Sequence, residues 1–322
     1  MRLDPTEKIL RTLAVETHRE KATRRSVLAL ALGGVPLLPG ALLAFDESVP
    51  VRLALSESIV GDVNLNDARA AMKVWVALMT KDLNVQIDPK LFSTTQEIQD
   101  RMRKGDLDAA ALNVLEYRQI AELLDSSQIV AAGGAAGLEQ YLILVKQNSG
   151  IRQLSDLQGK RFCLLKSPRM CLASDWLLTI LDAAHQGPAG QFFSSITVDT
   201  KFSRVVLPVF FGQAEACLTS KRGFETMCEL NPQVARELTA IASSPLMVLS
   251  FYIFRRHYQE QNRRRLIKVI SGLRNSTAGQ QLATLFQFEE LMVKDAGCLT
   301  TALAILDAAD RVRGHRLPAR KG

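Results

Sequence analysis

Residues 104–117 read KGDLDAAALNVLEY and carry the pattern that decides the fold class. A glycine turn at Gly105 leads into the apolar run 107–112, and the polar segment 113–117 follows it directly. An apolar run that is rich in small residues is typical of a strand covered on both faces. In an open α/β sheet, ligands bind beyond the carboxyl ends of such strands. The stretch therefore predicts a buried strand that ends at a binding site.

The same unit recurs along the chain. Apolar runs of strand length alternate with helical segments, and the pattern starts again after Gly150. We expect the other strands at 51–55, 85–87, 129–132, 141–145, 161–165, 196–198, 216–219, 238–242 and 251–254, and three late helices at 263–273, 278–286 and 300–312. The alternation predicts an α/β protein with mostly parallel sheets flanked by helices.

Length and composition agree with a two-lobed globular protein. The chain has 322 residues, of which 47% are hydrophobic and 23% charged, so disordered and coiled-coil classes are excluded. The net charge is +7, but residues 1–45 hold seven Lys/Arg and four Asp/Glu, which leaves a surplus of four for the remainder. That surplus suits an anionic ligand. It is too weak and too dispersed to predict nucleic-acid binding.

The motifs do not support a metal site, a cofactor site or catalysis. The five cysteines form no CxxC pair, and the four histidines lie far apart in sequence. No nucleotide-binding or hydrolase motif occurs. The odd number of cysteines argues against a disulfide framework, although export would allow one pair. Cys171 is the thiol on a candidate site loop, and it keeps a periplasmic enzyme open as a minor alternative.

The first 45 residues have the features of a targeting segment. Their polar part ends in Thr23-Arg24-Arg25, and an apolar run extends from Val27 to Phe45. This is the layout of a signal peptide, and the order Thr-Arg-Arg-Ser-Val-Leu resembles a twin-arginine export signal. The alternative is an uncleaved membrane anchor through residues 26–45, which two prolines and paired glycines weaken as a spanning helix. We expect a periplasmic mature protein that begins near Ala44.

Several further segments share an order and spacing with a known family. They are Lys104–Ala110, Asn113–Tyr117, Ser155–Arg161, Phe211–Ala216 and Ser243–Pro245. Over about residues 50–290 the chain resembles the type 2 periplasmic binding proteins, specifically the phosphate/phosphite/phosphonate-type substrate-binding proteins of ABC transporters. The resemblance implies two α/β lobes with the ligand between them. It implies a first lobe of 46–142 plus 250–322, a second lobe of 143–249, and two crossing strands, Tyr141–Val145 and Phe251–Phe254, as the hinge.

The candidate ligand residues lie in loops at the carboxyl ends of strands. They carry hydroxyls, amides and one cation, which is chemistry for holding an oxyanion. The predicted set is Ser56, Ser58, Asn113, Tyr117, Ser167, Arg169, Thr219, Ser220 and Ser244.

One loop departs from the pattern of the family. Phosphonate binders have a Ser/Thr-rich, glycine-containing run after the corresponding second-lobe strand, whereas this chain reads KSPRMCL at 166–172. One hydroxyl survives, and an arginine and apolar groups have entered. The change puts phosphonate itself in doubt but keeps an anion plausible, because arginine binds carboxylate, phosphate or sulfonate with two parallel hydrogen bonds.

We expect Arg169 and Tyr117, from opposite lobes, to meet on one ligand. The alternatives are that Tyr117 is a partly buried packing residue, that Arg169 is exposed or paired with Asp175, and that Ser167 caps a helix. As partners we expect a small anion and the permease of an ABC transporter, with the protein itself a monomer. A receptor that reports its ligand to a membrane histidine kinase is the alternative function, since the same fold serves both roles.

We predict that residues 1–44 are absent from the mature protein, because an arginine-led apolar run is removed during export. Intact-mass measurement of the exported protein tests this. A mass that still includes residues 1–44 would contradict cleavage and favour the anchored form.

Overall fold

The computed structural model describes residues 50–59, parts of 66–77, 86–134, 137–258, 260–275, parts of 279–284, and 290–316. The predicted export signal and the alternative anchor lie outside these residues. Within the described part of the chain, no helix has both the length and the apolar character needed to cross a membrane.

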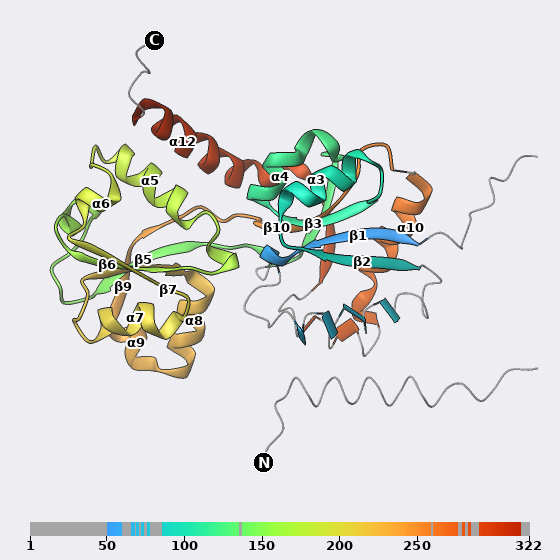
Figure 1. The fold of residues 1–322 in the computed structure, drawn as a ribbon. Helices are drawn as coiled ribbons and strands as arrows, with labels where there is room; N and C mark the ends of the chain where they lie inside the picture. Colours follow the sequence, from blue (N-terminus) through green and yellow to red (C-terminus); the bar gives the residue numbers. More distant parts are fainter. Residues whose placement is uncertain are drawn as a thin grey trace, which may run out of the picture.

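Two sheets divide the described chain into two lobes (Figure 1). The first sheet has the strand order β11-β4-β10-β3-β1-β2. Its strands are β1 (Val51–Ser56), β2 (Ile87–Phe92), β3 (Ala109–Asn113), β4 (Gln128–Ala132), β10 (Ser250–Phe254) and β11 (Leu291–Asp295). We call this sheet with its helices the first lobe.

The second sheet has the order β7-β6-β8-β5-β9 and forms the second lobe. Its strands are β5 (Tyr141–Lys146), β6 (Arg161–Leu165), β7 (Ser195–Asp199), β8 (Ala216–Ser220) and β9 (Leu238–Ser243). The α/β class and the two-lobed arrangement predicted from sequence are confirmed.

Helices cover both faces of the sheets, as the ribbon shows (Figure 1). In the second lobe, α5 and α6 lie over one face, while α7, α8 and α9 lie over the other. The main helices are α3 (Thr95–Arg103), α4 (Val114–Ile120), α5 (Ala173–Ala183), α6 (Ala189–Phe192), α7 (Phe202–Phe210), α8 (Lys221–Leu230), α9 (Pro232–Glu237), α10 (Glu260–Ser271) and α12 (Thr300–Arg316).

The sheets are mixed, whereas the sequence predicted mostly parallel ones. β1 is parallel to β2 and β3, and β6 is parallel to β7 and β8. β10 runs antiparallel to β3, and β5 runs antiparallel to β8 and β9. The reason is the crossing between lobes. A chain that arrives from the other lobe enters its sheet from the side facing that lobe, and therefore runs antiparallel to the neighbouring strands whose carboxyl ends lie on that side.

The crossing itself lies just before the strands that the sequence proposed for it. β5 and β10 each belong to one sheet, and the chain passes between the lobes before Tyr141 and before Ser250. The two passages pair as an antiparallel bridge between Glu139 and Met247. Each donates its backbone N–H to the carbonyl oxygen of the other, at 2.8 and 2.9 Å. The predicted hinge therefore consists of two paired segments next to the predicted strands.

Two other strands differ from the prediction. β2 was expected to end at Ile87, yet it continues through Pro89 to Phe92. β2 is an edge strand, and an edge strand accepts a proline because one side of it makes no ladder hydrogen bonds. β11 was not predicted, and it pairs with β4 as the opposite edge of the first sheet. The five cysteines are all free thiols.

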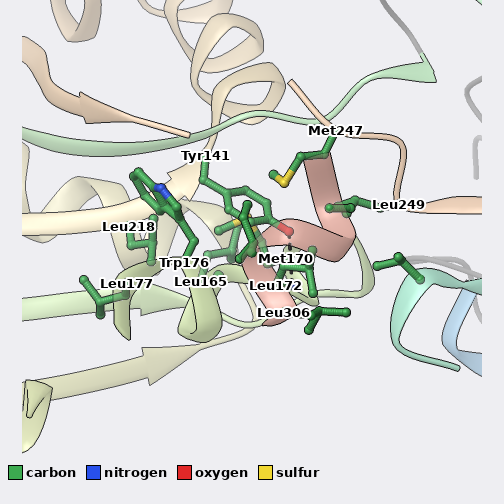
Figure 2. Close-up of a cluster of buried hydrophobic side chains, with 14 of the residues drawn as sticks. Tyr141, Leu165, Met170, Leu172, Trp176, Leu177, Leu218, Met247, Leu249 and Leu306 are labelled. Carbon is green, nitrogen blue, oxygen red and sulfur yellow. Dashed lines mark hydrogen bonds between the residues drawn. The ribbon is translucent and has the colours of Figure 1, made fainter. Parts of the chain in front are cut away.

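One apolar core continues from lobe to lobe. Met247 and Leu249 in the second crossing segment pack with Met170 and Leu172 of the divergent loop, and Leu306 of α12 lies beside them (Figure 2). The side chains of this cluster are at most 5% exposed. Burial of apolar surface is worth about 25 cal/mol per Å². The lobes therefore gain stability from facing each other before any ligand is counted.

Helix α12 joins both lobes. It begins beside the first lobe, contacts α4, and then packs along α5 of the second lobe (Figure 1). Arg118 on α4 pairs with Asp310 at 2.7 Å, and Asp310 pairs with Arg313 at 3.0 Å. Arg313 in turn binds Asp175 on α5. The prediction placed residues 250–322 with the first lobe, whereas α12 contacts both.

We predict that Arg313→Gln lowers the thermal unfolding temperature. The carboxylate of Asp175 is nearly buried and would lose its partner, but Arg313 is half exposed, so we expect a loss of only about 1 kcal/mol in the free energy of unfolding. Arg311→Gln, at an exposed position of the same helix, is the matched control and should change nothing. Equal unfolding temperatures for Arg313→Gln and wild type would show that this pair does not hold α12.

Candidate functional site

The first-lobe half of the site gathers where β1 and β3 end. Ser58, on the short 3₁₀ helix η1 (Glu57–Ile59), accepts a hydrogen bond from the Asn113 side-chain amide at 2.9 Å. The hydroxyl of Ser58 donates to Glu116 Oε2 at 2.8 Å. The hydroxyl of Ser56 donates to the other carboxylate oxygen of Glu116. The structure thus brings together three predicted residues, but it centres them on a glutamate that was not predicted.

Glu116 is held by the start of α4. The side chain of Asn113 accepts from the Glu116 N–H at 3.0 Å, and the Glu116 carboxylate accepts from the Asn113 N–H at 2.9 Å. This reciprocal pair is a capping box, which satisfies two backbone donors at a helix start. The signal was present in the sequence as Asn-x-x-Glu, and reading it would have placed Glu116 next to the predicted site.

The second-lobe half of the site depends on Arg169. The loop after β6 forms the 3₁₀ helix η5 (Pro168–Met170), and Arg169 Nη1 lies 2.5 Å from Glu139 Oε1. Glu139 belongs to the first crossing segment and is buried. Of the alternatives raised from sequence, pairing with Asp175 is wrong, because Arg313 occupies that carboxylate. No local motif marks Glu139, since its partner lies 30 residues away.

Tyr141 fixes the divergent loop against the second sheet. Its hydroxyl accepts from the Leu172 N–H and donates to the Arg169 carbonyl oxygen, both at 3.2 Å. Burial raises the pKa of Tyr141 well above its ordinary value, so the hydroxyl keeps its proton. Met170 and Leu172 point into the core between the lobes (Figure 2). The backbone of the loop is therefore anchored at Arg169 and at Leu172, on its C-terminal side.

The remaining second-lobe hydroxyls have individual roles. Ser220 caps α8 by accepting from the Gly223 N–H at 3.2 Å. Ser244 accepts from the Tyr141 N–H at 2.8 Å and donates to the Pro245 carbonyl oxygen at 2.9 Å. Thr219 is fully buried, and its hydroxyl has no hydrogen-bond partner among the described residues. Ser167 precedes η5 and makes no side-chain cap. Ser220 and Ser244 are thus used to hold the fold.

Tyr117 does not meet Arg169, contrary to our expectation. Its hydroxyl donates to Ser126 in its own lobe at 2.9 Å, and its ring packs edge-to-face on Phe251 with centroids 5.4 Å apart. The side chain is only 7% exposed. α4 turns Tyr117 into the core, because this residue comes one position after Glu116, which takes the face toward η1. The packing alternative is the one that the structure supports.

The two halves face each other closely. η1 of the first lobe lies against η5 of the second lobe. Cys171, next to η5, is near enough to Glu116 for that carboxylate to add to the rise in its thiol pKa, although burial is the main cause and brings the pKa to about 12. The turn that carries Ser58 thus lies next to the turn that carries Arg169. Among the described residues, no group of three His, Cys, Asp or Glu side chains forms a metal site.

Several solved structures share this two-lobed fold. XAC2383 from Xanthomonas citri bound to ATP superposes with a TM-score of 0.59 at 13% identity, over 83% of this chain and 99% of that chain. PhnD1 from Prochlorococcus marinus in complex with methylphosphonate gives 0.56 at 15% identity, over 81% and 98%. A binding protein component of an ABC phosphonate transporter from Pseudomonas aeruginosa gives 0.55 at 14% identity, over 85% and 90%. Each shares the fold with this chain.

The family follows from the sequence match. Comparison with curated proteins gives no match. The family model described as "ABC transporter, phosphonate, periplasmic substrate-binding protein" matches residues 59–293, which is most of the chain and includes both crossing segments and the larger part of each lobe. These residues contain Asn113 at the end of β3, Glu116 on α4, the Arg169 loop and the paired passages at Glu139 and Met247. The chain therefore belongs to the family of periplasmic substrate-binding proteins of phosphonate ABC transporters.

Proposed function

We propose that this receptor holds a small oxyanion between η1 and η5 and presents it to an ABC permease. The single observation that carries the proposal is Arg169, whose side chain is 35% exposed and whose backbone is anchored on Tyr141 at the junction of the lobes. Ser167 lies beside it in the loop, and on the opposing side the Asn113 amide has a second N–H beyond the one that it donates to Ser58. The Ser58 hydroxyl donates its own proton to Glu116 and therefore serves to hold that amide. An arginine fork with hydroxyl and amide donors is suited to phosphate, phosphonate, sulfonate or carboxylate oxygens.

The similar structures support the choice of probes. PhnD1 was solved with methylphosphonate and XAC2383 with ATP, and both ligands carry phosphorus oxyanions. The divergent loop of this chain replaces a Ser/Thr-rich run with Arg169, Met170 and Cys171. We therefore expect selectivity within the oxyanions to differ from that of a phosphonate receptor, because one cation and apolar side chains stand where hydroxyls would wrap the oxygens.

Two alternatives remain distinct from transport. A receptor for a membrane histidine kinase would use the same cleft, and pull-down with the cognate membrane proteins separates it from a permease partner. A periplasmic enzyme would need a nucleophile. The thiol of Cys171 has a pKa of about 12 because it is buried, so it is protonated at neutral pH and unsuited to that role. We further propose that the protein is a monomer, which light scattering tests.

We predict that Arg169→Ala weakens binding of the anion by more than the ~1 kcal/mol of an exposed ion pair, because a charge-assisted contact at the lobe junction is lost. A thermal-shift panel of phosphonates, phosphate, sulfonates and carboxylates selects the ligand. A compound at 100 times its Kd should add about 2.7 kcal/mol to the free energy of unfolding. Calorimetry then compares the variant with wild type.

Arg161→Ala is the matched control for this measurement. Arg161 pairs with Glu215 at 2.7 Å, at the end of β6 that lies away from the cleft. Its loss should leave anion affinity unchanged. Equal affinities for Arg169→Ala and wild type would mean that Arg169 does not touch the ligand.

We also predict that Cys171 reacts slowly with a thiol reagent in the native protein at pH 7.5. Its raised pKa leaves little thiolate, and the thiolate is the reactive form. Counting modified thiols before and after unfolding, by mass spectrometry with peptide assignment, measures this. Rapid native labelling of Cys171 would revive the enzyme alternative.

A further inference from the structure

We propose that Glu139 is a built-in competitor for the ligand at Arg169, and that an oxyanion binds by taking the place of the Glu139 carboxylate. This inference rests on the proposed function, because it assumes that Arg169 contacts the ligand. It adds a residue that sets affinity and specificity, located in the hinge and outside the predicted ligand set.

The first argument is the incomplete pairing of Glu139. Its Oε1 lies 2.5 Å from Arg169 Nη1, whereas its Oε2 is buried and has no hydrogen-bond partner among the described residues. A buried carboxylate oxygen without a donor is unfavourable, because its lost hydration is not replaced. The pair is therefore held by one good contact and opposed by one unsatisfied atom.

The second argument is the contrast with Glu116. Both oxygens of Glu116 accept hydrogen bonds, from Ser56, Ser58 and the Asn113 N–H. Both carboxylate oxygens of Glu116 are thus satisfied at the start of α4, so nothing favours the displacement of this carboxylate by an anion. Of Glu116 and Glu139, Glu139 is therefore the one that an incoming anion can replace with a better-bonded group at Arg169.

The third argument is the geometry of the guanidinium. Arg169 uses Nη1 for Glu139, and its side chain is 35% exposed. A phosphonate, phosphate or sulfonate offers several oxygens and can engage the guanidinium through two parallel hydrogen bonds, which one oxygen of Glu139 does not. A carboxylate that stayed in place would also repel the anion. Only anions that bind Arg169 more strongly than Glu139 would therefore be retained.

The position of Glu139 couples this exchange to the hinge. Its backbone forms both hydrogen bonds of the bridge to Met247, where the two passages between the lobes meet. Releasing the side chain from the second-lobe loop removes an attachment between that loop and the crossing segment. Ligand binding would thus act at the point about which the lobes turn.

The test is a comparison of Glu139→Gln with wild type, using methylphosphonate, inorganic phosphate and methanesulfonate as probes in calorimetric titrations. The amide has the shape of the carboxylate but lacks its charge. We expect the affinity for at least one of these anions to rise about fivefold or more, since the competing ion pair and the like charge are both removed. Glu215→Gln, which breaks the Arg161 pair far from the cleft, should leave affinity unchanged.

The double variant Glu139→Gln/Arg169→Gln provides the second readout. If the gain acts through Arg169, it disappears in the double variant, whereas a merely structural effect of Glu139→Gln would persist. Thermal unfolding of each variant verifies that it is folded, and Glu139→Asp, which shortens the side chain but keeps its charge, should give no gain.

The outcomes separate the two proposals. A gain in Glu139→Gln that is lost in the double variant supports the competitor role. Binding to wild type with no gain in Glu139→Gln overturns it and leaves the proposed function standing. Binding seen only in Glu139→Gln supports the role in its strongest form. Binding in neither protein overturns the competitor role for these three anions, and only an empty thermal-shift panel would then overturn the proposed function as well.

Discussion

The pairing of two backbone segments at Glu139 and Met247 is the constraint on which the rest of the structure depends. The chain passes between the lobes before β5 and before β10, and at this bridge these two passages hydrogen-bond to each other. Because both passages enter their sheets from the side facing the other lobe, β5 and β10 run antiparallel to the neighbouring strands whose carboxyl ends lie on that side. The carboxyl ends of β1, β3, β6 and β8 are thereby brought to face one another across a short distance.

This arrangement places hydroxyl, amide and guanidinium groups beside the hinge. In this structure those groups contact two carboxylates of the protein itself. Glu116 accepts from the first-lobe hydroxyls, and Glu139 pairs with Arg169. The two glutamates differ in their hydrogen bonding. Both oxygens of Glu116 accept hydrogen bonds, whereas Oε2 of Glu139 has no partner among the described residues. With the exchange that we propose at Arg169, such a receptor would retain only an anion that binds this arginine better than the Glu139 carboxylate does.

The apolar surface between the lobes has a related consequence. Met170, Leu172 and Met247 contribute to one core that spans both lobes (Figure 2), and α12 contacts α4 and α5 together. In a phosphonate receptor, the loop at 166–172 would offer hydroxyls to the ligand. Here the apolar side chains of Met170 and Leu172 make contacts between the lobes in place of part of that polar surface. The free energy that holds the lobes together therefore comes partly from apolar side chains of the protein.

The sequence by itself determined the class of the fold, most strands and several local structures. Alanines at 109–111 specify a strand buried on both faces, and Gly105 permits the positive φ of the turn before it. These features follow from interactions over a few residues, which periodicity and turn chemistry encode. The motif order also identified the family, and Arg169 was recognised as the cation of the divergent loop.

Only the tertiary structure decided the partners of the site residues. Arg169 pairs with Glu139, 30 residues away in the sequence and beyond β5 and β6, and Ser58 pairs with Glu116, 58 residues away. Tyr117 turns into the core instead of toward Arg169, because Asn113 caps α4 and the capping box directs Glu116 toward η1. Pairings of this kind depend on which strand ends are brought together by the passages through the hinge. That depends on the packing of whole lobes, and no local spacing in the sequence records it.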